Sequence, residues 1–267
     1  MKFNSLMTVC LLILASAYAG LAQVGKPQPQ VPANKGPVPN KLPPGPQQPW
    51  PWKYEFARGP ASALNTINGA TTGQTIRDPH ISATVMGGLP VFHIFYHPKY
   101  NGATPWKWKV KQIAKLNEVV DFLSYKNAYK TEPAHTQAKV VMVSVSGQNV
   151  FYIFYVTNDE AKSFSKPQWD GYFTNTPENV LAGVNKSSVG SDGIPINDFE
   201  VSAANNGFYY FFDPLYKGPG KWGWAKAETA EGALKYLNTK YTNKPVEYAS
   251  IAAIQEPSQL VFYVFYR

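Results

Sequence analysis

The chain has 267 residues, of which 44% are hydrophobic and 15% are aromatic, and its formal net charge at pH 7 is +8. That length allows one large domain or two ordinary ones, and it can bury a core without covalent cross-links. The single cysteine, Cys10, excludes an internal disulfide.

The first residues have the composition of an export signal. Lys2 gives a positive start, residues 6–14 are largely apolar, and small residues follow up to Ala22. This order is typical of a secretory signal peptide, which we predict at residues 1–22. The apolar run is too short to cross a bilayer, and no later run reaches the roughly 20 apolar residues of a membrane span. We therefore expect a secreted, extracellular protein without a membrane span, whose body contains no thiolate for catalysis or metal binding.

The basic charge predicts acidic partners. A charge of +8 attracts anionic glycans, acidic matrix proteins and mineral-associated polyanions. Nucleic acid is not expected as a partner because the chain is exported. The alternative is that the charge only maintains solubility.

Residues 23–49 form a segment dominated by Pro, Gln, Gly, Asn and Lys. So few apolar side chains cannot offset the entropy lost on ordering the chain. We predict a disordered linker with a bias to the polyproline II conformation. It is either a spacer or a segment that binds matrix partners.

One aromatic segment occurs four times further along the chain. It begins at Val91, Val150, Gly207 and Val261, where it reads VFHIFY, VFYIFY, GFYYFF and VFYVFY. A strand-like run precedes each copy, at residues 81–86, 139–146, 199–204 and 248–254. Because only short breaks rich in turn residues separate the two runs, we predict four β-hairpins with an aromatic second strand.

A helical pattern and a tryptophan loop precede each hairpin. Residues 110–124 and about 227–241 place apolar residues at three- and four-residue steps. Pro60 opens the first predicted helix, and Pro177 opens the third after the N-cap residue Thr176. The aromatic residues of the loops are Trp50, Trp52, Trp106, Trp108, Trp169, Tyr172, Trp222 and Trp224.

These patterns predict an α+β fold of four tandem αββ repeats over residues 50–267. The repeats lie at about 50–97, 98–156, 157–213 and 214–267. Both faces of the aromatic strand are apolar and need cover. We expect about eight mainly antiparallel strands and four helices in one pseudo-symmetric body, either a closed ring or two four-stranded halves. Closure, dimerisation or deliberate assembly would each protect an aromatic edge strand.

We find no signature of catalysis or metal binding. His93 and His97 are four residues apart, which on a strand means about 13 Å, too far for one metal ion. His93 also occupies the position of Tyr152, Tyr209 and Tyr263 in the other copies. The acidic residues cluster only in the third repeat, mainly in its loops, and no known nucleophile, phosphate-loop or calcium-loop motif occurs. We therefore predict no enzyme, no cofactor and no metal site.

The tryptophan loops are the best candidates for ligand contact. Tryptophan has a flat apolar face with an N–H donor, which suits stacking on sugar rings, and neighbouring lysines suit anionic glycans. The candidate residues are Trp52, Trp106, Lys107, Trp108, Lys109, Trp169, Tyr172, Trp222 and Trp224. The alternative is that each tryptophan covers the core of its repeat. Exposed tryptophans would favour ligand binding, and buried ones a structural role.

One sequon, Asn185-Lys186-Ser187, lies in a polar stretch and predicts N-glycosylation of Asn185.

The function expected from these features is that of a secreted, non-enzymatic structural or interaction protein of an extracellular matrix, such as mucus, cuticle, adhesive or the organic phase of a shell or other biomineral. Its partners would be acidic or neutral polysaccharides or acidic matrix proteins, and self-association is open. The alternative is a multivalent carbohydrate-binding protein that uses the repeated tryptophan loops. A secreted hydrolase ranks third.

Overall fold

The structure is a computed structural model. It describes residues 52–70, 73–98, 101, 107–130, 135–157, 168–186, 198–204, 206–214, 218, 220–239 and 246–267. The predicted signal peptide and linker, together with Trp50 and Trp106, lie outside these residues. The described residues belong to one compact unit, Gln48–Arg267.

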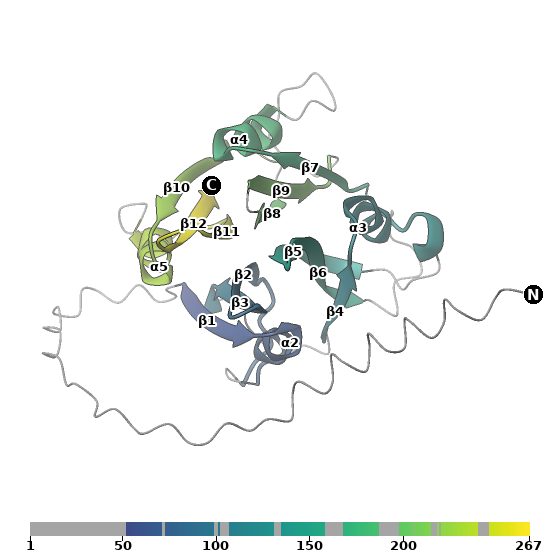
Figure 1. Ribbon diagram of the computed structural model, residues 1–267, viewed down its shortest axis with the longest axis horizontal. Coiled ribbons are helices and arrows are strands. Elements are labelled where there is room, and N and C mark those ends of the chain that lie inside the picture. Colours follow the sequence, from purple (N-terminus) through teal and green to yellow (C-terminus); the bar gives the residue numbers. More distant parts are fainter. Residues whose placement is uncertain are drawn as a thin grey trace, which may run out of the picture. The chain divides into compact units, whose positions relative to one another are not determined.

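Twelve strands of the described residues form four antiparallel sheets of three strands each (Figure 1). Sheet 1 contains β1 (Lys53–Arg58), β2 (His80–Met86) and β3 (Leu89–Tyr96), and sheet 2 contains β4 (Trp108–Ile113), β5 (His135–Val145) and β6 (Gln148–Thr157). Sheet 3 contains β7 (Asp170–Thr174), β8 (Phe199–Ala204) and β9 (Gly207–Phe212), and sheet 4 contains β10 (Gly223–Ala227), β11 (Ala249–Gln255) and β12 (Leu260–Tyr266). In every sheet the aromatic strand, which is third in sequence, lies in the middle.

One α-helix connects the first and second strands of each sheet. The helices are α2 (Pro60–Ile67), α3 (Leu116–Leu123), α4 (Pro177–Lys186) and α5 (Ala230–Thr239), and the 3-10 helix η2 (Asn127–Tyr129) follows α3. The backbone N–H of Asn179 donates to Thr176 Oγ1, as expected for an N-cap. The predicted mixed α+β class, the antiparallel hairpins and the four helices are confirmed.

The expected strand number of eight is wrong, because the first strand of each sheet was missed. Residues 110–113, predicted as the start of a helix, belong to β4 and pair with β6. Residue 227, predicted in the fourth helix, belongs to β10. These strands are only five or six residues long and carry polar residues, so their apolar pattern is weak, and pairing with a distant strand decides their conformation. The alternative of two four-stranded halves is also wrong, since each sheet has three strands.

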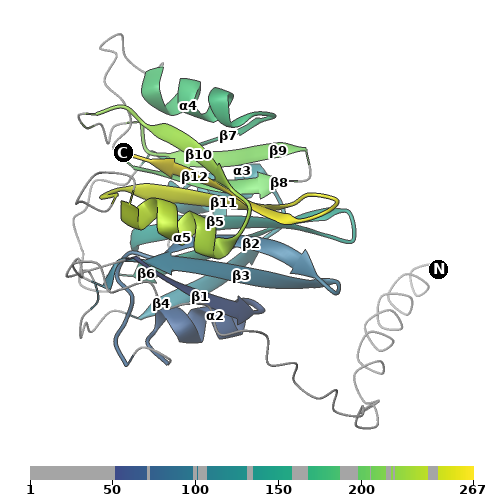
Figure 2. The same cartoon turned by 90° about the vertical axis from the view of Figure 1, so that its left-hand side faces the viewer.

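The second strands of the sheets lie together at the centre of this unit. β2 contacts β5, β5 contacts β8, β8 contacts β11, and β11 contacts β2 (Figure 1). These four inner strands thus form a closed circle. The first strands β1, β4, β7 and β10 lie on the outside, and each is an edge of its sheet. Figure 2 shows the same unit from the side, with α4 at the top and α2 at the bottom.

The aromatic strands supply the contacts between neighbouring sheets. The ring of Phe92 meets Tyr152 and Phe154 of the next sheet edge-on. The corresponding contacts are Phe151 with Tyr209 and Phe211, Phe208 with Tyr263 and Phe265, and Phe262 with His93 and Phe95. Such edge-to-face pairs stabilise by about 0.5–1.5 kcal/mol beyond burial of area. The last set joins sheet 4 to sheet 1, so the aromatic contacts also close the circle.

Candidate functional site

Three of the predicted tryptophans are buried at the start of an outer strand. Trp52, Trp108 and Trp222 are only 3%, 2% and 3% exposed. The indole N–H of Trp108 donates to the carbonyl oxygen of Ile76 at 2.8 Å, and that of Trp52 to Val246 at 2.9 Å. These side chains fill the core between neighbouring sheets, so they offer no face for stacking on a sugar.

An asparagine binds the backbone of each of these tryptophans. Asn68 Oδ1 accepts the N–H of Trp108 at 2.8 Å, and Asn68 Nδ2 donates to its carbonyl oxygen at 3.1 Å. Asn185 binds Trp222 in the same way, and Asn238 binds Trp52. We call these the Asn–Trp contacts. Since N–H and C=O of one residue point to the same side of a strand, the amide takes the place of a neighbouring strand.

The start of the outer strand in sheet 3 differs from the starts in the other three sheets. Trp169 is half-buried, and its N–H donates to Ser124 Oγ at 2.9 Å, while the Ser124 hydroxyl lies 3.3 Å from the Trp169 carbonyl oxygen. Trp224 is half-buried against Tyr263. Tyr172 is 44% exposed and stacks on Tyr210 and Phe212. The described tryptophans therefore act mainly as core residues, and Tyr172 is the aromatic candidate that faces solvent.

The sequon asparagine is engaged in one of these contacts. Asn185 Nδ2 donates to the Trp222 carbonyl oxygen at 2.9 Å, and Oδ1 accepts the Trp222 N–H at 2.8 Å. Ser187 lies outside the described residues. A glycan would have to be attached to a nitrogen that already donates a hydrogen bond.

A cluster of charged side chains lies where three inner strands begin. Lys139 Nζ is 2.9 Å from Asp78 Oδ1 and 2.9 Å from Glu200 Oε1. His80 Nε2 is 3.8 Å from the other oxygen of Asp78. His80, Lys139 and Glu200 are all buried, and each pairs across its hairpin with a phenylalanine. Glu200 lies within β8, in the strand predicted at residues 199–204.

Burial and the neighbouring charges together shift the pKa values of the residues in this cluster. Burial alone would lower the pKa of Lys139, but Asp78 and Glu200 raise it well above its usual value. Burial and the nearby Asp198 raise the pKa of Glu200 to about 8 against the opposing effect of Lys139. Burial would raise the pKa of Asp78, yet Lys139 brings it down to about 2. Lys139 therefore stays protonated as an internal counter-ion and is unsuited to act as a nucleophile or base. The sequence did not lead us to expect this cluster. A lysine at the start of an apolar predicted strand was the feature that could have indicated it.

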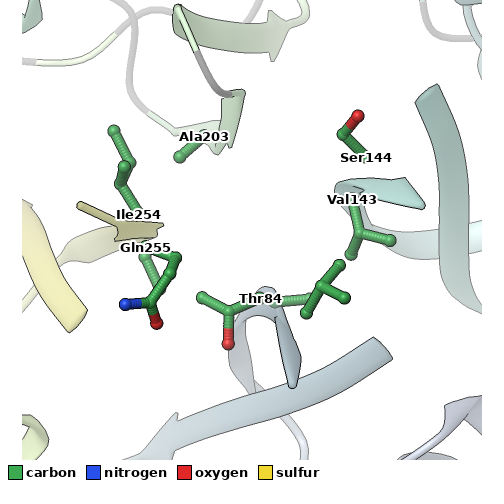
Figure 3. Close-up of a pocket in the computed structure, with 9 residues that line it drawn as sticks. Thr84, Val143, Ser144, Ala203, Ile254 and Gln255 are labelled. Carbon is green, nitrogen blue, oxygen red and sulfur yellow. The ribbon is translucent and has the colours of Figure 1, made fainter. Parts of the chain in front are cut away.

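A small hollow lies at the opposite ends of the inner strands. Its volume is about 230 Å³, and β2, β5, β8 and β11 all contribute to its lining. Figure 3 shows Thr84, Val143, Ala203 and Ile254 on different sides of this space. The lining holds no charged side chain, and the hydroxyl of Thr84 bonds to His93 Nε2 at 3.1 Å. The hollow therefore lacks acid–base groups. Nor does the described part of the chain contain three or more His, Cys, Asp or Glu grouped to hold a metal ion.

A run of lysines lies in and around β4 and in the residues that follow α3. Six lysines and two acids occur between residues 107 and 130. We call this group the lysine surface, which consists of Lys107, Lys109, Lys111, Lys115, Lys126 and Lys130. All are exposed except Lys111, which is half-buried with its Nζ 4.7 Å from the ring centroids of Phe122 and Tyr129.

Both acids of this segment have local partners. Glu118 lies 3.3 Å from Lys115, and Asp121 accepts a hydrogen bond from Asn127 Nδ2 at 2.6 Å. Lys107 and Lys109 were predicted ligand contacts, and they belong to the same segment of the chain as the four other lysines. Trp106 lies outside the described residues, and Trp108 points into the core. The group can therefore hold an anion through ammonium groups, without aromatic stacking from Trp108.

The chain matches no protein-family model, no curated protein and no solved structure. None of the helices in the described residues has the length and apolarity to cross a bilayer.

Proposed function

We propose that this protein is a secreted, non-enzymatic interaction protein of an extracellular matrix, which binds acidic partners through the lysine surface. The observation that carries the proposal is the excess of six lysines over two acids in residues 107–130, with both acids already engaged. Such an excess of exposed positive charge attracts sulfated or carboxylated polysaccharides and acidic matrix proteins.

The geometry of β4 favours an extended polyanion. Lys109 and Lys111 are two residues apart on one strand, so they share a face at a spacing of about 6.6 Å. Lys126 and Lys130 continue the positive charge beyond α3. A polymer with repeated negative groups can contact several of these lysines at once, so weak single contacts add up to useful affinity.

The tryptophans support a structural role in place of sugar stacking. Trp52, Trp108 and Trp222 are buried, and the Asn–Trp contacts bind their backbones. We propose further that the body consists of four copies of one strand–helix–strand–strand unit, arranged as a pseudo-symmetric closed ring. The common strand order of the sheets and the cyclic aromatic contacts support this proposal. A matrix scaffold needs such stability more than it needs a catalytic cleft.

The test compares two triple variants on an immobilised sulfated polysaccharide. One variant carries Lys109→Gln, Lys126→Gln and Lys130→Gln in the lysine surface. The control carries Lys53→Gln, Lys221→Gln and Lys235→Gln, which are exposed lysines outside the lysine surface. Both lose three charges. We expect the first variant to elute at clearly lower salt than the unaltered protein, and the control to elute close to it.

Equal shifts for both variants would mean that net charge alone drives binding, which contradicts the proposal. Chitin and calcium carbonate serve as neutral-polymer and mineral surfaces in the same assay. Binding to chitin that persists in about 0.5 M salt, where charge interactions are screened, would favour the carbohydrate-binding alternative.

A further inference from the structure

We propose that β7 is a docking edge that pairs with β4 of a second copy of this chain, so that copies assemble head to tail. The inference rests on the proposed function, because it names a second copy as one acidic partner of the lysine surface. Four observations on the outer strands lead to it.

The first observation is the distribution of charge along the four edge strands. β1 contains Lys53, Glu55 and Arg58, β4 contains Lys109 and Lys111, and β10 contains Lys226. β7 reads DGYFT, with a charge only at its first residue. Charged residues on an edge strand disfavour pairing with other chains unless the incoming edge carries the opposite charge. β7 is therefore the edge whose interior carries no charge.

The second observation is the contact at the start of each edge. In three sheets an asparagine amide binds both the N–H and the C=O of the tryptophan there. At β7 the single hydroxyl of Ser124 has to serve both groups of Trp169, at 2.9 and 3.3 Å. The hydroxyl can accept the N–H and donate its hydrogen to the carbonyl oxygen, but it serves both groups from one atom, whereas an amide uses two. The start of the sheet 3 edge is thus held by a smaller side chain than the starts of the other three.

The third observation is the exposure of two adjacent aromatic residues. Tyr172 is 44% exposed and Phe173 is 40% exposed. They lie on opposite faces of the strand, where Tyr172 stacks on Tyr210 and Phe173 packs on Tyr209. A strand added to this edge would meet an aromatic surface on both of its faces.

The fourth observation is charge complementarity, which selects the occupant. Residues 168–185 contain two acids and no lysine or arginine, whereas Glu200 further along the chain is buried against Lys139. Asp170 begins β7, and Glu178 is exposed in the first turn of α4. In a molecule of charge +8, two copies repel each other except where a basic face meets an acidic one. The β4 edge, with Lys109 and Lys111, has the complementary charge.

The two edges belong to different sheets, so the contact is heterologous. Each copy then offers one β4 and one β7, and assembly continues until a ring closes or a filament grows. This mode of assembly suits a matrix protein. A soluble polyanion would occupy the lysine surface and compete with assembly.

The experiment is sedimentation velocity of the full-length protein without its signal peptide, over a wide concentration range in about 20 mM salt, where surface charges are weakly screened. We expect species larger than a monomer that dissociate in about 0.5 M salt. Tyr172→Lys places a charge on β7 and should give a monomer. Phe56→Lys is the matched control, because Phe56 is 43% exposed on the already charged edge β1, and it should assemble like the unaltered protein.

The deciding measurement mixes two variants. Lys109→Glu lacks a functional β4 edge and Tyr172→Lys lacks a functional β7 edge, so each alone should be monomeric. Their mixture should form a dimer, because one intact edge of each kind remains. Self-association of Lys109→Glu alone would show β7 pairing with β7 and overturn the proposal, as would a monomer under all conditions. If the protein binds sulfated polysaccharide yet stays monomeric, this inference is refuted and the proposed function stands. If it assembles but does not bind polysaccharide, this inference stands and the proposed function is refuted.

Discussion

The contact between Asn238 and Trp52 lies where sheet 4 meets sheet 1. We predict that it stabilises the protein as much as the corresponding contact between Asn68 and Trp108 does. The contact of Asn238 joins residues 186 positions apart in the sequence. Asn238→Ala removes an acceptor 2.6 Å from the Trp52 N–H and a donor 3.3 Å from its carbonyl oxygen. Trp52 is only 3% exposed, so water cannot easily replace either partner.

The expected loss follows from these two groups. A buried polar group left without a partner costs about 1–3 kcal/mol, and the longer of the two bonds contributes least. We therefore expect Asn238→Ala to lower the free energy of unfolding by about 2–4 kcal/mol. Asn68→Ala should cost as much, because Trp108 is equally buried. Ser124→Ala should cost less, about 1 kcal/mol, since Trp169 is half-buried and water can reach its backbone.

Equilibrium unfolding in urea, followed by tryptophan fluorescence and far-UV circular dichroism, measures these differences. Asn179→Ala is the control, because Asn179 is an exposed asparagine of α4. It should change stability by less than about 0.5 kcal/mol. A loss below 1 kcal/mol for Asn238→Ala, next to a full loss for Asn68→Ala, would refute the reasoning. The closing contact would then already be open in the native protein.

Three further predictions concern acid stability, a close backbone contact and the sequon. Burial lowers the pKa values of His80 and His93 from 6.5 to about 4, so folding favours their neutral forms. The stabilising contribution of each histidine should be full above pH 6.5 and be lost toward pH 4, by up to about 3 kcal/mol, whereas Glu200, whose pKa is raised, contributes a loss of stability in the opposite direction as the pH rises toward 8. The difference in stability between the unaltered protein and His93→Tyr therefore isolates the share of His93, and urea titrations at several pH values can measure it. Gly207→Val introduces the valine found at this position in the other aromatic segments. It should lower the free energy of unfolding by more than about 2 kcal/mol, because a Cβ there would clash with the Thr174 carbonyl oxygen. An unchanged midpoint of thermal unfolding would contradict this expectation. Asn185→Gln, the usual change to remove a glycan, should lower the stability of bacterially produced protein by about 1–3 kcal/mol, and chemical denaturation of the unglycosylated chain measures it.

The hairpins and helix starts could be predicted from the sequence because local rules determine them. Alternating apolar residues and short turns define the strand pairs, and Pro60, Pro177 and Thr176 mark two helix starts that the structure confirms. The outer strands could not be predicted. Val110 and Ile113 fit a helical period as well as a strand, and only pairing with β6, some 40 residues away, distinguishes the two.

The roles of single side chains were harder to predict than the elements. A tryptophan beside prolines fits both a ligand platform and a core residue, and burial depends on which sheet packs next to it. Lys139 appeared in a predicted strand, but its partner Asp78 comes from the bend before β2 and its partner Glu200 from β8. The exposure of Lys107 and Lys109 could be predicted from local composition, because a run of charged residues stays at the surface in most folds.

The Asn–Trp contacts have a consequence for where the polypeptide may start. Sheets 4 and 1 meet through a side-chain contact of the same kind as those at the starts of β4 and β10. A circular permutant that begins near Trp108 and runs from Arg267 through a short linker into Trp52 would keep the three Asn–Trp contacts and the contact between Ser124 and Trp169. The order of the four sheets along the chain can therefore be changed without removing any of these contacts.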